Sequence, residues 1–534
     1  MATHSTPEEG TVPPTDPGPG RAEPGSTQID AQADAPTDTH PVPDRDGPGR
    51  HGAASTADAG QVSAAERAGP AAARAADFGI DTTTKTTSEA IRAYVQNLRN
   101  GELGALPALL GLLALFVLFT VLDSGGTFPS LLNLANLLQQ GAGQTVIAMG
   151  LVFVLLIGEI DLAAGTASGL AAAVLALHQV SNGNLLGAMG NTVFVAFVAI
   201  MALAVGLAVW LRIWAGAAFG ALGLVLILVG FPPNPWFEIL LAVCVGVVIG
   251  VLTGFLVAKL GMPSFVVTLA LFISWQGVIL QLIGDGGTLG LRNPVLVAVA
   301  NGSMSTLGSW LLFLVGAGGY AAVLLNRQVR RRKLGLVAQP TGLVLIKIAA
   351  VVLLAAVITF LLTLDRGPGT IRIAGVPYVV PIVLVLLVAG TYLLDRTRFG
   401  RHVYAVGGNR EAARRAGINV VRIRATVFVI SSALAAIGAV IYSSKVGSVS
   451  PASGGGNTLL FAVGAAVIGG TSLFGGRGRI SNAVIGGAVL ATVNNGLGLL
   501  GQPASVVFLV NGVVLLLAAG VDVLSRRRSA AAGR

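Results

Sequence analysis

The strongest constraint on this chain is a series of long apolar segments between residues 105 and 523, each bounded by Gly, Pro, Asn or charged residues. About 18 or more consecutive apolar residues can cross a bilayer as a helix. We therefore expect an all-α fold, a polytopic transmembrane bundle of about 12 to 14 helices. The predicted spans lie near residues 105–122, 143–160, 163–179, 191–211, 215–231, 236–258, 264–284, 307–325, 343–363, 378–394, 425–444, 457–474, 480–500 and 505–523.

The composition agrees with a membrane protein. The chain is 54% hydrophobic and 11% charged, whereas about a quarter of the residues are charged in an average soluble domain. The net charge of +10 does not indicate a nucleic-acid partner, because the basic residues cluster beside apolar runs without interleaved aromatics. Cys244 is the only cysteine, and His178 and His402 stand alone. We expect neither a disulfide within the chain nor a metal site.

The composition changes along the chain and predicts four regions. Residues 1–78 are rich in Pro, Gly, Ala, Thr and Asp, which predicts a disordered cytoplasmic tail. A juxtamembrane segment follows at 79–104, then a transmembrane domain at 105–525 with a cytoplasmic loop at 396–424, and a basic cytoplasmic tail at 526–534. No apolar stretch precedes a cleavage site in the first region, so we expect an uncleaved first span.

The basic clusters predict the orientation, because Arg and Lys in short loops are retained in the cytoplasm. They fall on one side of the membrane if the number of spans is even, which predicts that both termini are cytoplasmic. The clusters are Arg92 with Arg99, Arg327–Lys333, Arg396–Arg424 and Arg526–Arg528.

The loop at 396–424 carries the signals of a short helix. Asn409 is a good N-cap, Glu411 lies in the first turn where the helix dipole favours an anion, and Gly417 suits the position after the last turn. These residues predict a helix of about two turns, which is too short to be stable alone in water. We expect it to dock on another surface; the alternative is a solvated basic loop that only fixes the topology.

Glu159 and Asp161 are carboxylates beside long apolar stretches, where a charge is costly and suggests a function. They are two residues apart and do not share a helix face, and Gly158 and Gly165 allow a helix break. One interpretation is that they line a polar path or anchor the broken helix. The other is that both lie in water at the end of a span.

The segment around this pair has a faint echo further along the chain. Residues 157–165 read IGEIDLAAG and residues 468–476 read IGGTSLFGG, and each lies at a break between two predicted spans. A duplicated half would explain the match, and so would chance in Gly-rich membrane sequence.

Several motifs resemble one family. Glu411-Ala412-Ala413, followed by Gly417, resembles the EAA loop of ATP-binding cassette importer permeases. The wider stretches GGNREAARRAGINV, GEIDLAAG and LVAKLGMPSFVVTLALFISWQGVIL are similar to the ribose, xylose and arabinose permeases. The basic RQVRRRKLGL stretch, the acidic EIDL form and the chain length most resemble the xylose type. The long tail and two additional spans near 191–231 depart from the family pattern.

The resemblance implies a function and partners. It implies that Asn409, Glu411, Ala412, Ala413 and Gly417 form a coupling helix seated in a cleft of an ATPase subunit with two nucleotide-binding domains, which uses ATP and Mg. An extracytoplasmic sugar-binding protein, a permease homodimer and transport of xylose or another pentose across the cell membrane are also implied. This chain would bind no cofactor and would not be an enzyme. In agreement, none of its lysines follows a glycine, as a P-loop requires.

Neutral sugars favour amide and aromatic contacts. Trp275, Gln276, Asn494 and Asn495 are therefore candidates for the translocation path, although packing or a helix break would also explain them. A proton-coupled secondary sugar transporter is the alternative function, because it too needs many spans and intramembrane carboxylates. A membrane-embedded enzyme would need clustered acidic or histidine residues at a span mouth, where only Glu159 with Asp161 qualifies.

Overall fold

The computed structural model describes residues 92, 106–336, 339–367 and 370–531. The predicted tail at 1–78 and all but one residue of the juxtamembrane segment lie outside the described residues. The chain divides into two units, Met1–Asp81 and Thr82–Arg534, and every helix below belongs to the second.

Long apolar helices dominate the described part of the chain, which confirms a polytopic helical membrane protein. Within the described ranges, ten helices are long and apolar enough to cross a membrane, and α4, α9 and α19 are shorter apolar helices. Each of the fourteen predicted segments overlaps a helix of the following set: α4 Leu106–Leu122, α5 Leu131–Leu156, α6 Ala163–Val180, α8 Asn191–Trp210, α9 Trp214–Val229, α10 Pro235–Gly254, α11 Ser264–Ile283, α13 Thr306–Lys333, α14 Thr341–Thr363, α15 Val379–Arg396, α18 Val420–Val446, α19 Gly456–Ile468, α20 Ile480–Leu499 and α21 Ala504–Ala531.

Shorter elements connect the long helices. A π-helical turn, η1, continues α10, and a two-stranded antiparallel sheet joins the connection after α11 to the connection after α18. These elements are α7 Leu185–Met189, η1 Phe255–Lys259, β1 Leu289–Gly290, α12 Pro294–Asn301, α16 Arg398–Gly408, α17 Arg410–Arg415 and β2 Ser448–Val449.

The starts of α5 and α18 are among the predicted boundaries that are wrong. Helix α5 begins at Leu131 and not at residue 143, because Asn133 in its first turn is buried and exchanges hydrogen bonds with Asn495 of α20. Helix α18 begins at Val420 and not at residue 425, because the Asn419 side chain caps it by accepting from the Arg422 amide. In both places polar residues that resemble a loop in the sequence find partners inside the helical structure.

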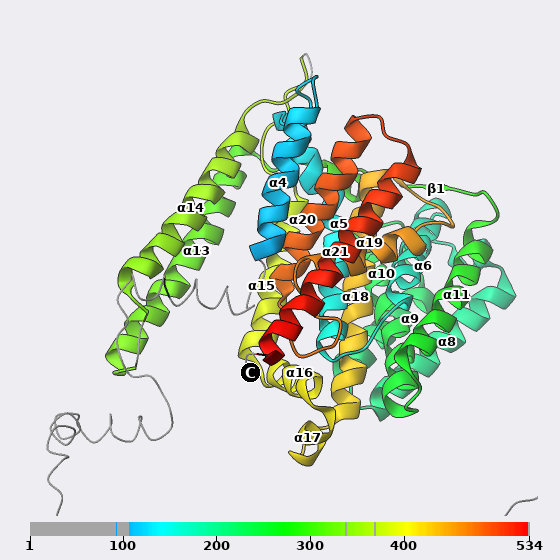
Figure 1. Ribbon diagram of the computed structural model, residues 1–534. Coiled ribbons are helices and arrows are strands. Elements are labelled where there is room, and N and C mark those ends of the chain that lie inside the picture. Colours follow the sequence, from blue (N-terminus) through cyan, green and yellow to red (C-terminus); the bar gives the residue numbers. More distant parts are fainter. Residues whose placement is uncertain (1–91, 93–105, 337–338, 368–369, 532–534) are drawn as a thin grey trace, which may run out of the picture. The chain divides into compact units, whose positions relative to one another are not determined.

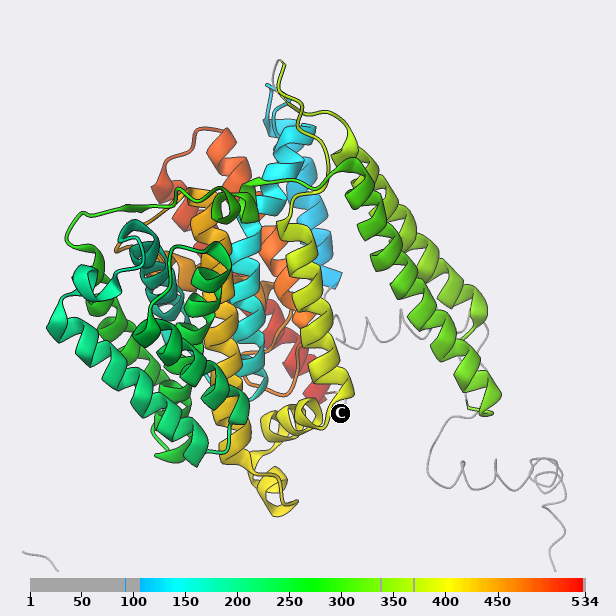
Figure 2. The ribbon, with the colours of Figure 1, turned by 180° about the vertical axis from the view of Figure 1, so that it is seen from behind.

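Helix α18 lies at the centre of the bundle and packs against α5, α6 and α10 (Figures 1 and 2). Glycines make the close approach possible, because small residues let helix backbones come together in a membrane. Gly246, Gly250 and Gly254 follow one another at four-residue spacing on α10. A Cβ at Gly250 would lie 2.6 Å from Cα of Val429, and one at Gly254 would lie 2.8 Å from Cα of Ala425.

Helices α13 and α14 form a hairpin that packs mainly on itself. Its contact with the bundle is at one end, where Leu362 of α14 and Leu312 of α13 pack with Ala135 of α5. From there the hairpin diverges from the bundle toward the end that carries Lys333, as both views show (Figures 1 and 2). Most of its apolar side chains are therefore exposed.

Candidate functional site

The predicted short helix is present as α17, Arg410–Arg415. Oδ1 of Asn409 accepts a hydrogen bond from the Ala412 amide at 2.9 Å, so Asn409 caps the helix as its sequence position predicts. Gly417 ends it with a φ of +80°, a conformation that favours glycine. Helix α16 lies across the end of the bundle where α15 ends and α18 begins, and α17 projects beyond it (Figures 1 and 2).

One face of α17 is open to a partner and the other is closed by this chain. Glu411, Ala412 and Gly417 are exposed, whereas Ala413 is buried and belongs to the same apolar cluster as residues of α5 and α18. Among the residues that the structure describes, Glu411 pairs only with Arg414 and Arg415 of its own helix, at 3.0 and 3.3 Å. Ala412, Ala413 and Gly417 are the small residues of the predicted docking helix. Of these three, only Ala412 and Gly417 are exposed to another protein.

Glu159 lies in the break between α5 and α6 and contacts the first residue of α17. Its Oε1 accepts from Nη2 of Arg410, the first residue of α17, at 2.5 Å, and from Nη2 of Arg424 in α18 at 2.7 Å. The Glu159 and Arg424 side chains are only 7% and 11% exposed, whereas Arg410 is half-exposed. The geometry therefore favours an anchor and disagrees with a carboxylate in open water.

Asp161 holds the same break from the other side. It is buried, its Oδ2 accepts from the Ser431 hydroxyl of α18 at 2.9 Å, and its Oδ1 accepts from the Ala164 amide at 3.2 Å. The hydrogen bond from the Ala164 amide satisfies a backbone donor at the start of α6, where the N-cap residue Leu162 has no side-chain acceptor. Asp161 thus connects the first turn of α6 to the middle of α18.

The two segments that echo each other in sequence contact each other. The Gly476 amide donates to the Leu156 carbonyl at 2.8 Å, which joins the break after α19 to the break after α5. The end of α16 lies against both, because a Cβ at Gly407 would collide with the Leu156 carbonyl and lie 3.0 Å from the Gly476 nitrogen. The contact leaves the question of a duplication open, but it places α16 against two helix breaks.

The residues predicted for a path contact different parts of the structure. Gln276 of α11 donates to the Pro451 carbonyl at 2.5 Å, and its neighbour Trp275 is buried in an apolar cluster. Asn494 accepts from Asn511 of α21 at 2.7 Å. Asn495 exchanges hydrogen bonds with Asn133 of α5. The two asparagines act as interhelical contacts, and they do not share hydrogen-bond partners with Gln276.

Several buried ionisable side chains of the described residues were not among the predicted site residues. Arg424 was included in a basic run that only predicted orientation. His178 at the end of α6 and Glu238 in the first turn of α10 are buried, with Nδ1 and Oε1 3.2 Å apart, and the His178 ring stacks on Phe231. Glu238 carried a usable signal, because it is a carboxylate at the edge of the predicted span 236–258.

Comparison with known proteins identifies the family. Residues 213–519 match the family model described as "Branched-chain amino acid transport system / permease component". The xylose transport system permease protein XylH of Escherichia coli (strain K12) is 33% identical over 414 residues, which is 76% of this chain and 88% of the relative. The same-named protein of Haemophilus influenzae is 31% identical over 407 residues, 76% of this chain and 92% of the relative.

A shorter match links the chain to another permease. The ribose import permease protein RbsC of Escherichia coli (strain K12) is 43% identical over 154 residues, 29% of this chain and 48% of that protein. No solved structure matches the chain. The chain therefore belongs to the family of branched-chain amino acid transport system permease components, and it is a multi-pass membrane transport subunit and not an enzyme.

Proposed function

We propose that this chain is the membrane-spanning subunit of an ATP-binding cassette importer that carries a monosaccharide, xylose or another pentose, into the cytoplasm. The similarity to xylose and ribose permeases supports a sugar as substrate. A separate ATPase subunit with two nucleotide-binding domains, using ATP and Mg, would drive transport. An extracytoplasmic sugar-binding protein would deliver the substrate, and two copies of this chain would form the pathway.

The observation that carries the proposal is the set of contacts around Glu159. A force applied to the exposed face of α17 reaches Arg410 in its first turn, and Arg410 bonds to Glu159 in the break between α5 and α6. Glu159 in turn bonds to Arg424 of the central helix α18. Docking of an ATPase on α17 would therefore act directly on the break and on the bundle core, which is what coupling requires.

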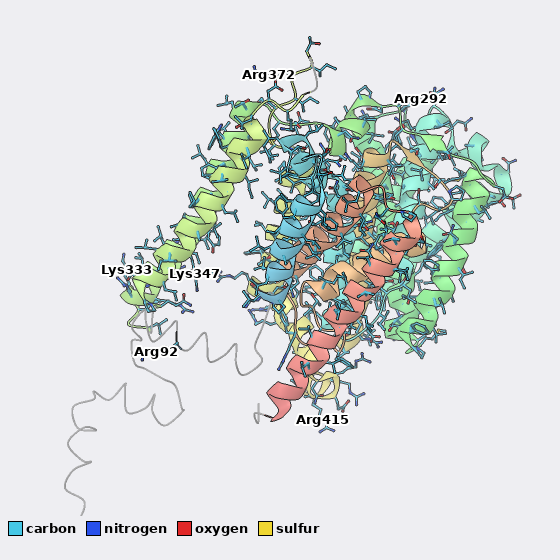
Figure 3. The ribbon with its side chains drawn as sticks, turned by 45° about the horizontal axis from the view of Figure 1, so that its top comes forward. Arg92, Arg292, Lys333, Lys347, Arg372 and Arg415 are labelled. Carbon is cyan, nitrogen blue, oxygen red and sulfur yellow. The ribbon has the colours of Figure 1, made fainter. Side chains whose placement is uncertain are left out.

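The distribution of basic residues supports the proposed orientation, with α17 and both termini in the cytoplasm. Lys333, Lys347 and Arg415 gather toward one end of the membrane domain, and Arg292 and Arg372 lie at the other (Figure 3). The cluster at the end of α13 and the Arg-rich α16–α18 region outweigh the opposite end.

Uptake measurements in cells that lack this chain test the substrate. Cells complemented with the wild-type chain should take up labelled xylose, ribose or arabinose, with one pentose preferred, and the deletion strain should not. Restored uptake of a branched-chain amino acid, with no pentose transported, would contradict the proposed substrate class.

A further inference from the structure

An open surface cavity of about 390 Å³, lined by exposed side chains, lies between the ends of α13 and α15. Its volume falls within the roughly 300–1,000 Å³ of small-molecule sites. The cavity is lined by Arg327, Arg330, Arg331, Leu334, Asp395 and Arg396. Four arginines and one aspartate thus line the same cavity, which gives its lining an excess of three positive charges.

The charges come from two helices, which distinguishes the cavity from a simple basic helix end. Arg at the last turn of a helix stabilises the helix dipole and keeps the loop in the cytoplasm without any ligand. Those effects do not require Arg396 of α15 to share a cavity with Arg327 and Arg331 of α13. A single guanidinium can donate two parallel hydrogen bonds to phosphate oxygens, and arginines from two helices can contact one phosphate from two sides.

The hairpin whose end lines the cavity also exposes apolar side chains. On α13, Val323 and Val329 are exposed, and on α14 Leu345 and Ile346 are exposed, all in the half of the hairpin that carries Lys333. These side chains lie on helices long and apolar enough to span the membrane. A ligand of the cavity can therefore place a charged group among the arginines and hydrocarbon along the hairpin.

We propose that the arginines between α13 and α15 bind the phosphate headgroup of an anionic phospholipid, whose acyl chains lie along the exposed faces of the α13–α14 hairpin. Basic pockets between membrane helices on the cytoplasmic side bind lipid phosphates by the same chemistry. The hairpin contacts the bundle at its opposite end. A lipid in the cavity would therefore connect the Lys333 end of the hairpin to α15. Assignment of the site to the cytoplasmic leaflet rests on the proposed orientation, but the binding itself does not.

The test measures lipid binding to the purified full chain in detergent by native mass spectrometry, with phosphatidylglycerol and phosphatidylcholine as probes. The variant Arg327→Ala/Arg331→Ala removes two cavity charges. Arg332→Ala/Lys333→Ala removes two charges from the same helix end, outside the cavity lining, and serves as the matched control. We expect phosphatidylglycerol to bind at least tenfold more weakly to the first variant and within about twofold of wild type to the second.

Three results would overturn the proposal. Equal weakening in both double variants would show diffuse attraction without a site. Equal affinity for phosphatidylcholine would show that the negative charge of the lipid is not recognised. Displacement of the lipid by millimolar inorganic phosphate would identify a soluble anion as the ligand. Asp395→Ala should bind phosphatidylglycerol at least as tightly as wild type, because it removes the one opposing charge. Unchanged melting temperatures of the variants establish that altered binding does not reflect misfolding. Sugar uptake is not part of the assay, so its outcome is independent of the proposed transport function.

Discussion

Glu159 and Arg424 form a buried ion pair, with Oε1 and Nη2 2.7 Å apart and side chains 7% and 11% exposed. The pair joins a break between two helices to the central helix α18, and Arg410 extends it to the exposed helix α17. A buried charge that loses its partner costs far more than an exposed one. This difference makes the arrangement testable by substitution.

Glu159→Ala should destabilise the chain strongly, because it leaves the Arg424 guanidinium buried without its carboxylate. The loss is expected to be about 3–5 kcal/mol. Glu411→Ala is the control, since the Glu411 pairs are exposed and worth about 0–1 kcal/mol. Thermal unfolding in detergent measures both. A Glu159→Ala variant that melts no earlier than the control would contradict the pairing, and Glu159→Ala/Arg424→Ala should recover part of the loss.

Asp161 should tolerate an amide but not an alanine. Asparagine retains an oxygen for the Ala164 amide and a polar group for Ser431, whereas alanine leaves both without their present partner, at about 1–3 kcal/mol for each buried group. We expect Asp161→Asn to retain substantial uptake and Asp161→Ala to lose it at equal membrane levels. If both variants are equally inactive while folded, the carboxylate carries a proton and the alternative of a proton-coupled transporter gains support.

Substitutions on α17 should separate docking from folding. Ala412 is exposed, so Ala412→Arg should abolish sugar-stimulated ATPase activity while the chain inserts at normal levels. Ala413 is buried at 4% exposure, so Ala413→Arg should instead lower the amount of folded chain. Membrane levels and ATPase stimulation, measured on the same preparations, distinguish the two. Normal stimulation in Ala412→Arg would remove α17 as the docking element.

Glycine on α10 should be irreplaceable where it contacts α18. A Cβ at Gly250 meets the backbone of α18, whereas a Cβ at Gly277 of α11 meets nothing within 4 Å. Gly250→Ala should destabilise by roughly 1–3 kcal/mol through overpacking, and Gly277→Ala should change stability by about 1 kcal/mol or less. Similar melting temperatures for the two variants would contradict the close packing of α10 on α18.

The success of the sequence analysis depended on how local each signal was. Helix α17 could be predicted because its end signals are local. Asn409 caps its start, and Gly417 follows its last turn within a few residues. The start of α5 was missed because Asn133 resembles a loop residue until its partner Asn495 is known. The pairing of Glu159 with Arg410 joins residues 251 positions apart, and no local pattern encodes it. Burial of Ala413 likewise depends on helices distant in the sequence.

The energy source tests the central claim most directly. The chain, reconstituted in proteoliposomes with its ATPase subunit and sugar-binding protein, should accumulate labelled pentose when ATP and Mg are supplied on the side that carries the ATPase. Uptake should persist when an uncoupler collapses the proton gradient, and it should fall to background in Ala412→Arg. Uptake driven by a pH gradient, without ATP and without the ATPase subunit, would contradict the account.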